Sequence, residues 1–282
     1  MITKIDEGKV LLKDGFSTRE HKKMLYGEAV AGYGLYEDER GISRLGETVV
    51  RKKNKIPVGG ILAILSTMFG ATSDLSITTL NELMGSGTTG TVTDHHGMVG
   101  LFNVGLGGCG AAYTDEKEVL DQDNVVPSMI PFRIVDSKSE ITDKNKYWFE
   151  KQLDNGKYAY YLKAFESTPT IKTLWKDASE EGEDGTEVVG NPKDSDRTEG
   201  MESFVQMILR ISRNDLRDYF AIYEDSKYPR FNSIGLCLGQ KGSLEDGTEE
   251  YKNVIQFSIL NFSNEMLHFD KDLTIIYRIY LS

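Results

Sequence analysis

Apolar and polar residues alternate over short stretches through the second half of the chain. After residue 97, aromatic or β-branched runs are separated by clusters of Asp, Asn, Gly or Pro. This pattern is typical of strands joined by turns. The predicted strands cover residues 97–105, 131–135, 157–165, 170–175, 202–212, 231–239, 253–262 and 273–281.

Two details of these runs predict how the strands are arranged. Asn155-Gly156 stands just before the run at 157–165, and an Asn-Gly pair is a strong signal for a tight hairpin. The run at 273–281 is apolar on both faces, so we expect it in the interior of a sheet and not at an edge.

The first third of the chain has a different pattern, which predicts mainly helix. Residues 9–12 are typical of one short strand. Ser17 and Glu20 match a capping box, which predicts a short helix through Met24 and Leu25.

Two further segments have helical spacing. Between residues 56 and 84, the side chains of Ile77, Leu80 and Met84 are three and four positions apart, as on one face of a helix. A turn at 70–74 divides this segment into two helices. Later in the chain, Asn214 is suited to cap a helix that runs through residues 215–225.

Together these patterns predict an α+β fold with a β-rich body, built as an antiparallel sheet or sandwich. Residues 1–96 form a mixed, partly helical N-terminal region, and residues 97–282 form a β-rich domain. The two regions are either separate domains or one continuous domain.

The charge of the chain limits its partners. A net charge of −11 argues against sequence-specific nucleic-acid binding, because the only basic run is residues 51–55, which we expect to be a solvated turn. The longest apolar run, residues 56–70, is interrupted by Pro57, Gly59 and Gly60 and is shorter than the ~20 residues that span a bilayer. We therefore expect no membrane partner.

Most of the negative charge lies in one segment, residues 177–202, which we call the acidic arm. It contains ten Asp or Glu residues against Lys193 and Arg197, a local net charge of −8. Burying unpaired charges is costly, so we expect an exposed, protruding arm that contacts a neighbouring molecule. Its candidate interface residues are Glu180, Glu181, Glu183, Asp184, Glu187, Asp194, Asp196 and Glu199.

A glycine-rich segment, residues 85–90, matches the G-x-G-x-x-G pattern of dinucleotide sites. Such a site requires a strand before the glycines and a helix after them, whereas this segment follows a helix-like run and precedes one without helical period. We therefore expect no bound cofactor. Gly85, Gly87 and Gly90 are interpreted as a structural loop that contributes to an interface between subunits.

The next segment contains Asp94, His95 and His96, residue types that bind metals. Adjacent residues on a strand point to opposite faces, so the two histidines converge on one ion only if a turn redirects them. Hydrogen bonding within a loop is the favoured interpretation. A catalytic or intersubunit metal at these residues is the alternative, and a Cys109 dyad with either histidine is another.

The last three predicted strands carry a resemblance to virion structural proteins of tailed bacteriophages. The matching residues are Ile234, Gly235, Leu236, Leu238, Gly239, Phe257, Ser258, Asn261, Phe262, Leu273, Ile275, Tyr277 and Ile279. The segment 97–167 also resembles proteins encoded near the head and tail genes of large phages with contractile tails.

This resemblance implies a non-enzymatic subunit of the head–tail neck (connector or collar) or of the tail, which is assembled in the host cytoplasm and resides in the virion. Its partners are then copies of itself in a ring around the virion axis and neighbouring virion proteins. Genomic DNA would pass nearby without specific binding, and the acidic arm would prevent the channel wall from retaining it.

Two alternatives stay open. The first is a receptor- or glycan-binding module of a fibre or baseplate, in which Trp148 and Trp175 stack on sugars. The second is a metal-dependent hydrolase that uses Asp94, His95 and His96.

Overall fold

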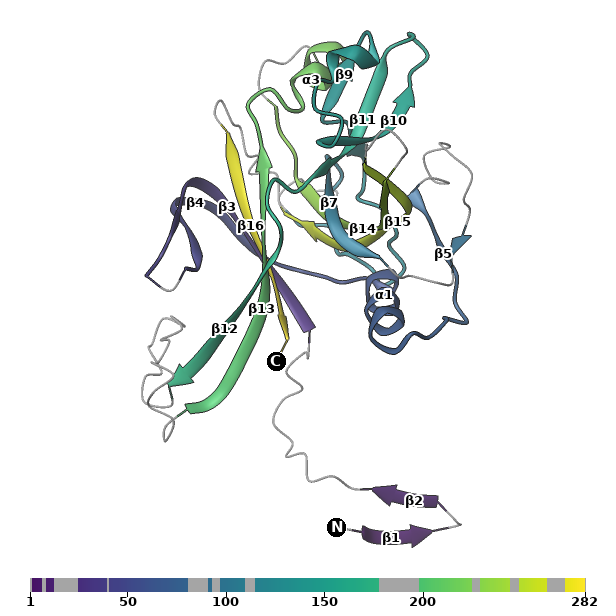
Figure 1. The fold of residues 1–282 in the computed structure, drawn as a ribbon, viewed down its shortest axis with the longest axis vertical. Coiled ribbons are helices and arrows are strands. Elements are labelled where there is room, and N and C mark those ends of the chain that lie inside the picture. The colour runs from purple at the N-terminus through teal and green to yellow at the C-terminus, as the bar shows by residue number, and fades with distance from the viewer. Residues whose placement is uncertain are drawn as a thin grey trace.

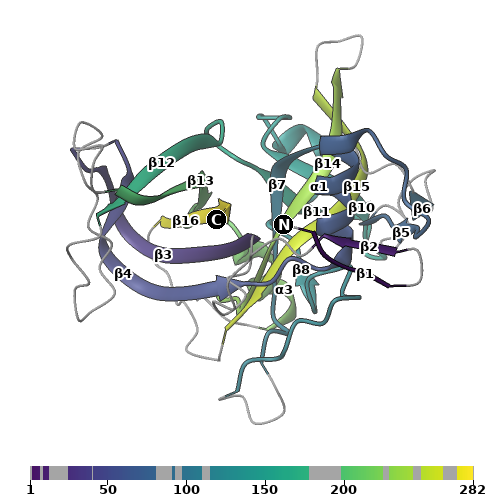
Figure 2. The ribbon, with the colours of Figure 1, turned by 90° about the horizontal axis from the view of Figure 1, so that it is seen from below.

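The chain folds as two antiparallel sheets packed face to face, with helices at the periphery (Figure 1, Figure 2). The predicted β-rich α+β fold is confirmed. Within the residues that the structure describes, no helix is long and apolar enough to cross a membrane. The computed structural model describes residues 2–6, 9–12, 25–39, 41–80, 91–92, 97–109, 115–177, 198–224, 229–243, 249–262 and 272–281.

One sheet has seven strands in the order β10-β11-β7-β14-β15, with the short strands β8 and β9 paired to β7 and β11. It contains the five strands predicted at 97–105, 131–135, 157–165, 231–239 and 253–262. The strands are β7 (Met98–Gly105), β8 (Met129–Ile130), β9 (Arg133–Val135), β10 (Tyr147–Gln152), β11 (Tyr158–Ala164), β14 (Ser233–Ser243) and β15 (Glu249–Asn261).

The other sheet has five strands in the order β12-β13-β16-β3-β4. Its predicted strands at 170–175, 202–212 and 273–281 are confirmed, and the last of these lies in the interior of the sheet, as its two apolar faces indicated. The strands are β3 (Leu25–Glu37), β4 (Ser43–Asn54), β12 (Thr170–Asp177), β13 (Thr198–Ile211) and β16 (Leu273–Leu281).

The prediction for the N-terminal region is wrong in part. Leu25, placed at the end of a short helix, instead begins β3, while residues 13–24 lie outside the described residues. The run 51–55 is not a turn, because its first four residues belong to β4. Since β3 and β4 hydrogen-bond into a sheet with β12, β13 and β16, that sheet contains strands from both of the regions expected from the sequence.

The main core lies between the two sheets. Alternate residues of β16, Leu273, Ile275, Tyr277 and Ile279, pack in one cluster with residues of β7, β14 and β15 such as Phe102, Leu236 and Phe257. The Tyr277 hydroxyl lies in this core and is hydrogen-bonded to Ser258 (2.8 Å) and to the Asn54 amide (2.6 Å). The hydrogen bond between Tyr277 and Ser258 thus joins β16 of one sheet to β15 of the other.

The two sheets are also joined by backbone at one edge. Just after β4, the N–H and C=O groups of Lys55 exchange hydrogen bonds with those of Ile259 in β15, each at 3.0 Å. The edge strand of the five-stranded sheet therefore continues onto the edge of the seven-stranded sheet.

The β3–β4 hairpin coils strongly and turns back over the outer face of its own sheet (Figure 2). The register shifts at Gly32, where an added Cβ would lie 1.9 Å from the Glu47 carbonyl oxygen, and Gly34 has a left-handed φ of 70°. The start of β4 is held by two residues of the sheet. Gln206 donates to the Ser43 hydroxyl at 2.9 Å, and Arg278 donates to the Ser43 carbonyl at 2.8 Å.

The helical predictions are confirmed in one place and wrong in another. Helix α1 (Val58–Phe69) lies within the predicted segment and ends at Gly70, which is left-handed. Ile77, however, lies in the two-residue strand β5 (Ile77–Thr78), which pairs with β6 (Thr91–Val92). Residues 81–90, with Met84, lie outside the described residues.

The predicted second helix exists but begins later than expected. Helix α3 (Arg217–Tyr223) has Leu216 at its N-cap position, so the proposed cap at Asn214 is wrong. Leu216 is fully buried and its N–H donates to the Phe132 carbonyl at 2.8 Å. Burial of this leucine, not a polar cap, fixes the start of the helix.

The smaller elements follow local sequence signals. Gly156 has a φ of 83° in the turn between β10 and β11, so the Asn-Gly hairpin is confirmed. The strand predicted at 9–12 is β2 (Lys9–Leu12), which pairs with β1 (Ile2–Asp6) in a separate hairpin. A single 3-10 turn, η1 (Lys138–Glu140), is closed by a capping box between Ser137 and Glu140.

The tight contact at Gly32 gives a first prediction. Gly32→Ala should lower the free energy of unfolding by ~1–3 kcal/mol, because its methyl group would overlap the Glu47 carbonyl oxygen. Gly46→Ala is a matched control in the same hairpin, since its Cβ would lie 3.5 Å from the Gly34 carbonyl oxygen. Chemical denaturation of both variants is the measurement, and equal stabilities would contradict the role given to Gly32.

Candidate functional site

An ion pair lies fully buried where the two sheets meet. Lys163 is on β11 of the seven-stranded sheet, and Asp215 is in the turn that follows β13 of the five-stranded sheet. The Lys163 Nζ lies 2.7 Å from the Asp215 Oδ2, and both side chains are 0% exposed. A charge pair this deep is rare unless its remaining hydrogen-bonding capacity is filled.

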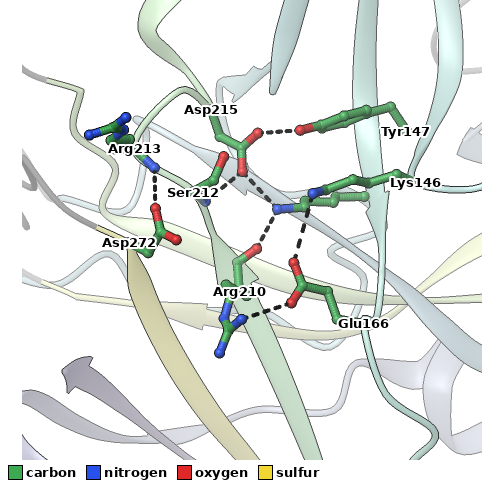
Figure 3. Close-up of polar contacts among 9 residues, drawn as sticks. Lys146, Tyr147, Glu166, Arg210, Ser212, Arg213, Asp215 and Asp272 are labelled. Carbon is green, nitrogen blue, oxygen red and sulfur yellow. Dashed lines mark hydrogen bonds and ion pairs between the residues drawn. The ribbon is translucent and has the colours of Figure 1, made fainter. Parts of the chain in front are cut away.

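That capacity is filled by groups from both sheets (Figure 3). The Tyr147 hydroxyl, on β10, donates to the Asp215 Oδ1 at 2.7 Å, and the backbone N–H of Ser212 donates to Oδ2 at 2.7 Å. The Lys163 ammonium also donates to the Arg210 carbonyl at 2.5 Å. Strands β10 and β11 of one sheet are thereby tied to the end of β13 in the other.

Burial shifts the protonation equilibria of this cluster. Desolvation lowers the pKa of Lys163, and the negative charge of Asp215 opposes that effect. Burial raises the pKa of Tyr147 far above its ordinary value of 10.0, and the nearby Asp215 carboxylate raises it further. The tyrosine is therefore a neutral hydrogen-bond donor at neutral pH.

A second layer of charges surrounds the pair at the surface. Glu166 lies 3.3 Å from Arg210 and 3.8 Å from Lys146 (Figure 3). Nearby, the backbone N–H of Arg213 donates to Asp272 at 2.9 Å, just before β16 begins. These exposed contacts hold the same junction but are individually weak.

The chemistry available to this cluster is limited by access. A lysine of lowered pKa beside a carboxylate resembles a catalytic arrangement. With both side chains 0% exposed, however, no dissolved substrate can reach either group. We therefore interpret the Lys163–Asp215 pair as a structural connection between the sheets.

Sequence reasoning missed this pair. Lys163 lies in the apolar run Tyr160-Tyr161-Leu162-Lys163-Ala164, and a charged residue inside a predicted buried strand is the signal that could have identified it. Its partner lies 52 positions later, in a turn whose residues show no pattern that predicts this pairing.

Most residues proposed from the sequence lie outside the described residues. This holds for Gly85, Gly87, Gly90, Asp94, His95 and His96, and for Glu180, Glu181, Glu183, Asp184, Glu187, Asp194 and Asp196. Glu199 is described as part of β13. Among the residues that are described, no three His, Cys, Asp or Glu side chains are grouped to hold a metal ion.

The two cysteines and one tryptophan have packing roles in the described structure. Cys109 is partly buried and its sulfur accepts a hydrogen bond from the Asn232 amide at 2.9 Å, while Cys237 is fully buried. Trp148 packs edge to face on Tyr251 with ring centroids 5.1 Å apart, and its N–H donates to the Asn145 carbonyl at 3.1 Å. This packing favours a structural role over sugar stacking for Trp148.

The acidic arm is placed by the strands that flank it. The pairing of β12 with β13 runs from the pair Thr170 and Gln206 to the pair Asp177 and Thr198. Residues 178–197 therefore connect the two strands of a hairpin. Among the described residues, the pairing of β13 with β16 reaches as far as Ser203 and Leu281. Within this part of the chain, Thr198–Glu202 pair with β12 alone, and Figure 1 shows this two-stranded ribbon extending beyond the sheet.

Comparison of the chain with models of known protein families, with curated protein sequences and with solved structures found no match. The functional inference therefore depends on the residues of this chain.

The buried pair predicts a large, non-additive effect of mutation. Lys163→Met or Asp215→Asn alone should cost ~3–5 kcal/mol of unfolding free energy, because each leaves a buried group without its partner. The double variant should cost at least ~1 kcal/mol less than the sum of the two. Denaturant unfolding of all three variants measures this coupling.

A matched control is the exposed ion pair of Lys157 and Asp136 in the neighbouring hairpin. Lys157→Met and Asp136→Asn should each leave the unfolding free energy nearly unchanged, because solvent screens exposed ion pairs. Additive, equally small effects at Lys163 and Asp215 would contradict the structural role of the buried pair.

The raised pKa of Tyr147 predicts a pH dependence. Above pH 10.0, the ordinary pKa, tyrosine loses its proton in the unfolded chain but keeps it in the fold, so stability falls as pH rises. From about pH 10 to 11.5, the unfolding free energy of Tyr147→Phe should fall less steeply than that of the unchanged chain, by ~1.4 kcal/mol per pH unit. Parallel pH profiles would show that Tyr147 has no such shift.

Proposed function

We propose that this chain is a non-enzymatic structural subunit that assembles with copies of itself, as a subunit of the neck or tail of a tailed-phage virion. In this proposal its function is carried out by contact surfaces. The observation that carries the proposal is the two-stranded ribbon of β12 and β13, which extends past the sheet and connects to the acidic arm.

The ribbon is suited to reach a neighbouring molecule. It is continuous with the five-stranded sheet, whose inner face belongs to the main core, so its base is rigid. Arms that project from a rigid body are a common way to build the repeated heterologous contacts of a ring. The net charge of −8 between residues 177 and 202 gives this arm a preference for basic surfaces.

The phage context comes from the resemblance in the last three strands. Those residues are in β14, β15 and β16, except Phe262, which directly follows β15. All three strands contribute side chains to the main core. The resemblance therefore involves the sandwich, and it does not include the acidic arm. A ring position near the virion axis would also place the arm where its charge repels passing DNA.

The role of the arm can be tested by a deletion that preserves the hairpin. Replacing residues 178–197 with Asn-Gly would leave the paired residues Asp177 and Thr198 on either side of a two-residue turn. We expect a folded protein with unchanged far-UV circular dichroism whose mass, measured by light scattering, falls to that of a monomer. A full-size assembly after this deletion would count against the proposed role of the arm.

A second variant tests whether the arm acts through its negative charge. The seven carboxylates between residues 178 and 197 can be changed to their amides while the length of the arm is kept. If the arm docks on a basic surface, this variant should assemble more weakly than the unchanged chain, and the difference should shrink in high salt.

The hydrolase alternative makes the opposite prediction. If Asp94, His95 and His96 bind a catalytic metal, the purified protein should contain about one transition metal ion per chain. Metal analysis of the oligomer and of an Asp94→Asn variant distinguishes the two functions. Stoichiometric metal that is lost in the variant would favour the hydrolase.

A further inference from the structure

Helix α1 fully buries only small residues. Val58, Leu62 and Ile64 pack partly buried against the core, and its other four large apolar residues are exposed. Gly59, Gly60, Ala63 and Ser66 are the buried positions of the helix. Besides Thr67, the exposed positions are large and apolar: Ile61 (44% exposed), Leu65 (46%), Met68 (67%) and Phe69 (72%). This is the reverse of the usual arrangement for a helix packed on a globular core.

The reversal is imposed by a close approach to β15. A Cβ on Gly60 would lie 2.1 Å from the Phe257 carbonyl oxygen, and one on Gly59 would lie 3.3 Å from the Ile77 side chain. Only small residues fit against the sheet at this distance. The helix therefore cannot rotate to bury its larger side chains.

The exposed residues form one continuous face. Ile61, Leu65, Met68 and Phe69 are spaced by four, seven and eight positions, which places them along one side of the helix. The sequence from residue 56 to residue 73 contains no charged residue. Single exposed apolar side chains are normal, but a contiguous group of this size marks an interaction site.

The surroundings of this face argue against an anionic membrane as its partner. The basic run that precedes α1 is largely neutralised, since Arg51 pairs with Glu28 at 3.2 Å, Lys52 pairs with Glu116, and Lys55 pairs with Asp121 at 3.1 Å. With a net charge of −11, the chain is repelled by acidic lipid headgroups. An apolar protein segment is a better match.

The chain itself contains such a segment in its N-terminal hairpin. The two strands, Ile2–Asp6 and Lys9–Leu12, contain five large apolar residues: Ile2, Ile5, Val10, Leu11 and Leu12. Among the described strands they pair only with each other, and they lie away from the sandwich (Figure 1). A lone two-stranded hairpin is marginally stable in water, so it needs an apolar surface to cover it.

We propose that the β1–β2 hairpin of one copy packs on the exposed face of α1 in a second copy. This inference rests on the proposed function as a self-assembling subunit and identifies one of its interfaces. The hairpin is joined to β3 by residues 13–24, a segment that can span at most ~40 Å, enough to reach an adjacent molecule.

Cross-linking of two differently labelled copies tests the contact directly. In a Cys109→Ser background, one protein carries Leu11→Cys and the other Met68→Cys, and the two are mixed and treated with a short bismaleimide. We expect a covalent dimer that contains one chain of each kind, identified by mass spectrometry. Ile171→Cys, an equally exposed apolar position on β12 (76% exposed), replaces Met68→Cys in the control and should not cross-link.

The cross-link has two outcomes that would overturn the proposal. One is the absence of the mixed dimer when light scattering shows that the sample is oligomeric. The other is a cross-link within a single chain when Leu11→Cys and Met68→Cys are combined and diluted, because the hairpin would then cover its own helix.

A second measurement does not depend on cross-linking geometry. Deletion of residues 1–12 and the double change Leu65→Gln with Met68→Gln should each raise the dissociation constant of the oligomer at least tenfold. Combining the deletion with the double change should raise the dissociation constant little further than either change alone, because both remove the same contact. Ile171→Gln should leave the dissociation constant unchanged.

These outcomes separate the two proposals. An oligomer that is unaffected by both changes would contradict the α1 interface and leave the assembly proposal standing. A chain that is monomeric in every form would instead contradict the proposed function itself.

Discussion

The Lys163–Asp215 ion pair is the interaction on which the junction of the two sheets depends. The desolvation of two charges opposes folding, and it is offset only because Tyr147, Ser212 and the Arg210 carbonyl complete the hydrogen bonds of the pair. A hydrophobic contact at this place would tolerate sliding between the sheets. A buried pair with fixed donors and acceptors permits one arrangement, and that arrangement aligns β13 with the neighbouring sheet.

The position of β13 determines the rest of the proposed functional architecture. The same 14-residue strand that ends beside the ion pair begins in the ribbon that connects to the acidic arm. At the opposite edge of the sheet, β4 leads through the Lys55–Ile259 contact into α1, whose exposed face is the second proposed interface. The sandwich thus carries both proposed contact surfaces, and a repeated subunit of a ring would require them at fixed positions.

The sequence predicted those parts of the fold in which local pattern and final environment agree. The strand pattern of β13, the apolar run of β16, the Asn155-Gly156 turn and the end of α1 at Gly70 follow from the periodicity and conformational preferences of the residues involved. The strands β3 and β4 were not predicted, because Gly27, Gly32 and Gly34 are also typical of the end of a helix. In the fold, Gly27 and Gly32 allow close packing in the coiled hairpin, and Gly34 adopts a left-handed conformation. Asn214 has a side chain suited to cap α3, but the helix begins after Leu216, whose burial determines the start. The Lys163–Asp215 pair and the reversed packing of α1 depend on contacts between distant segments, which one sequence does not reveal.

In the proposed function, this chain acts by assembling with copies of itself. The most direct test is the mass of the full-length protein in solution, measured by light scattering over a range of concentrations, with metal content determined on the same sample. We expect a closed oligomer whose mass is a whole multiple of the chain mass and which carries no stoichiometric transition metal. A monomer at every concentration that holds about one metal ion per chain would contradict it.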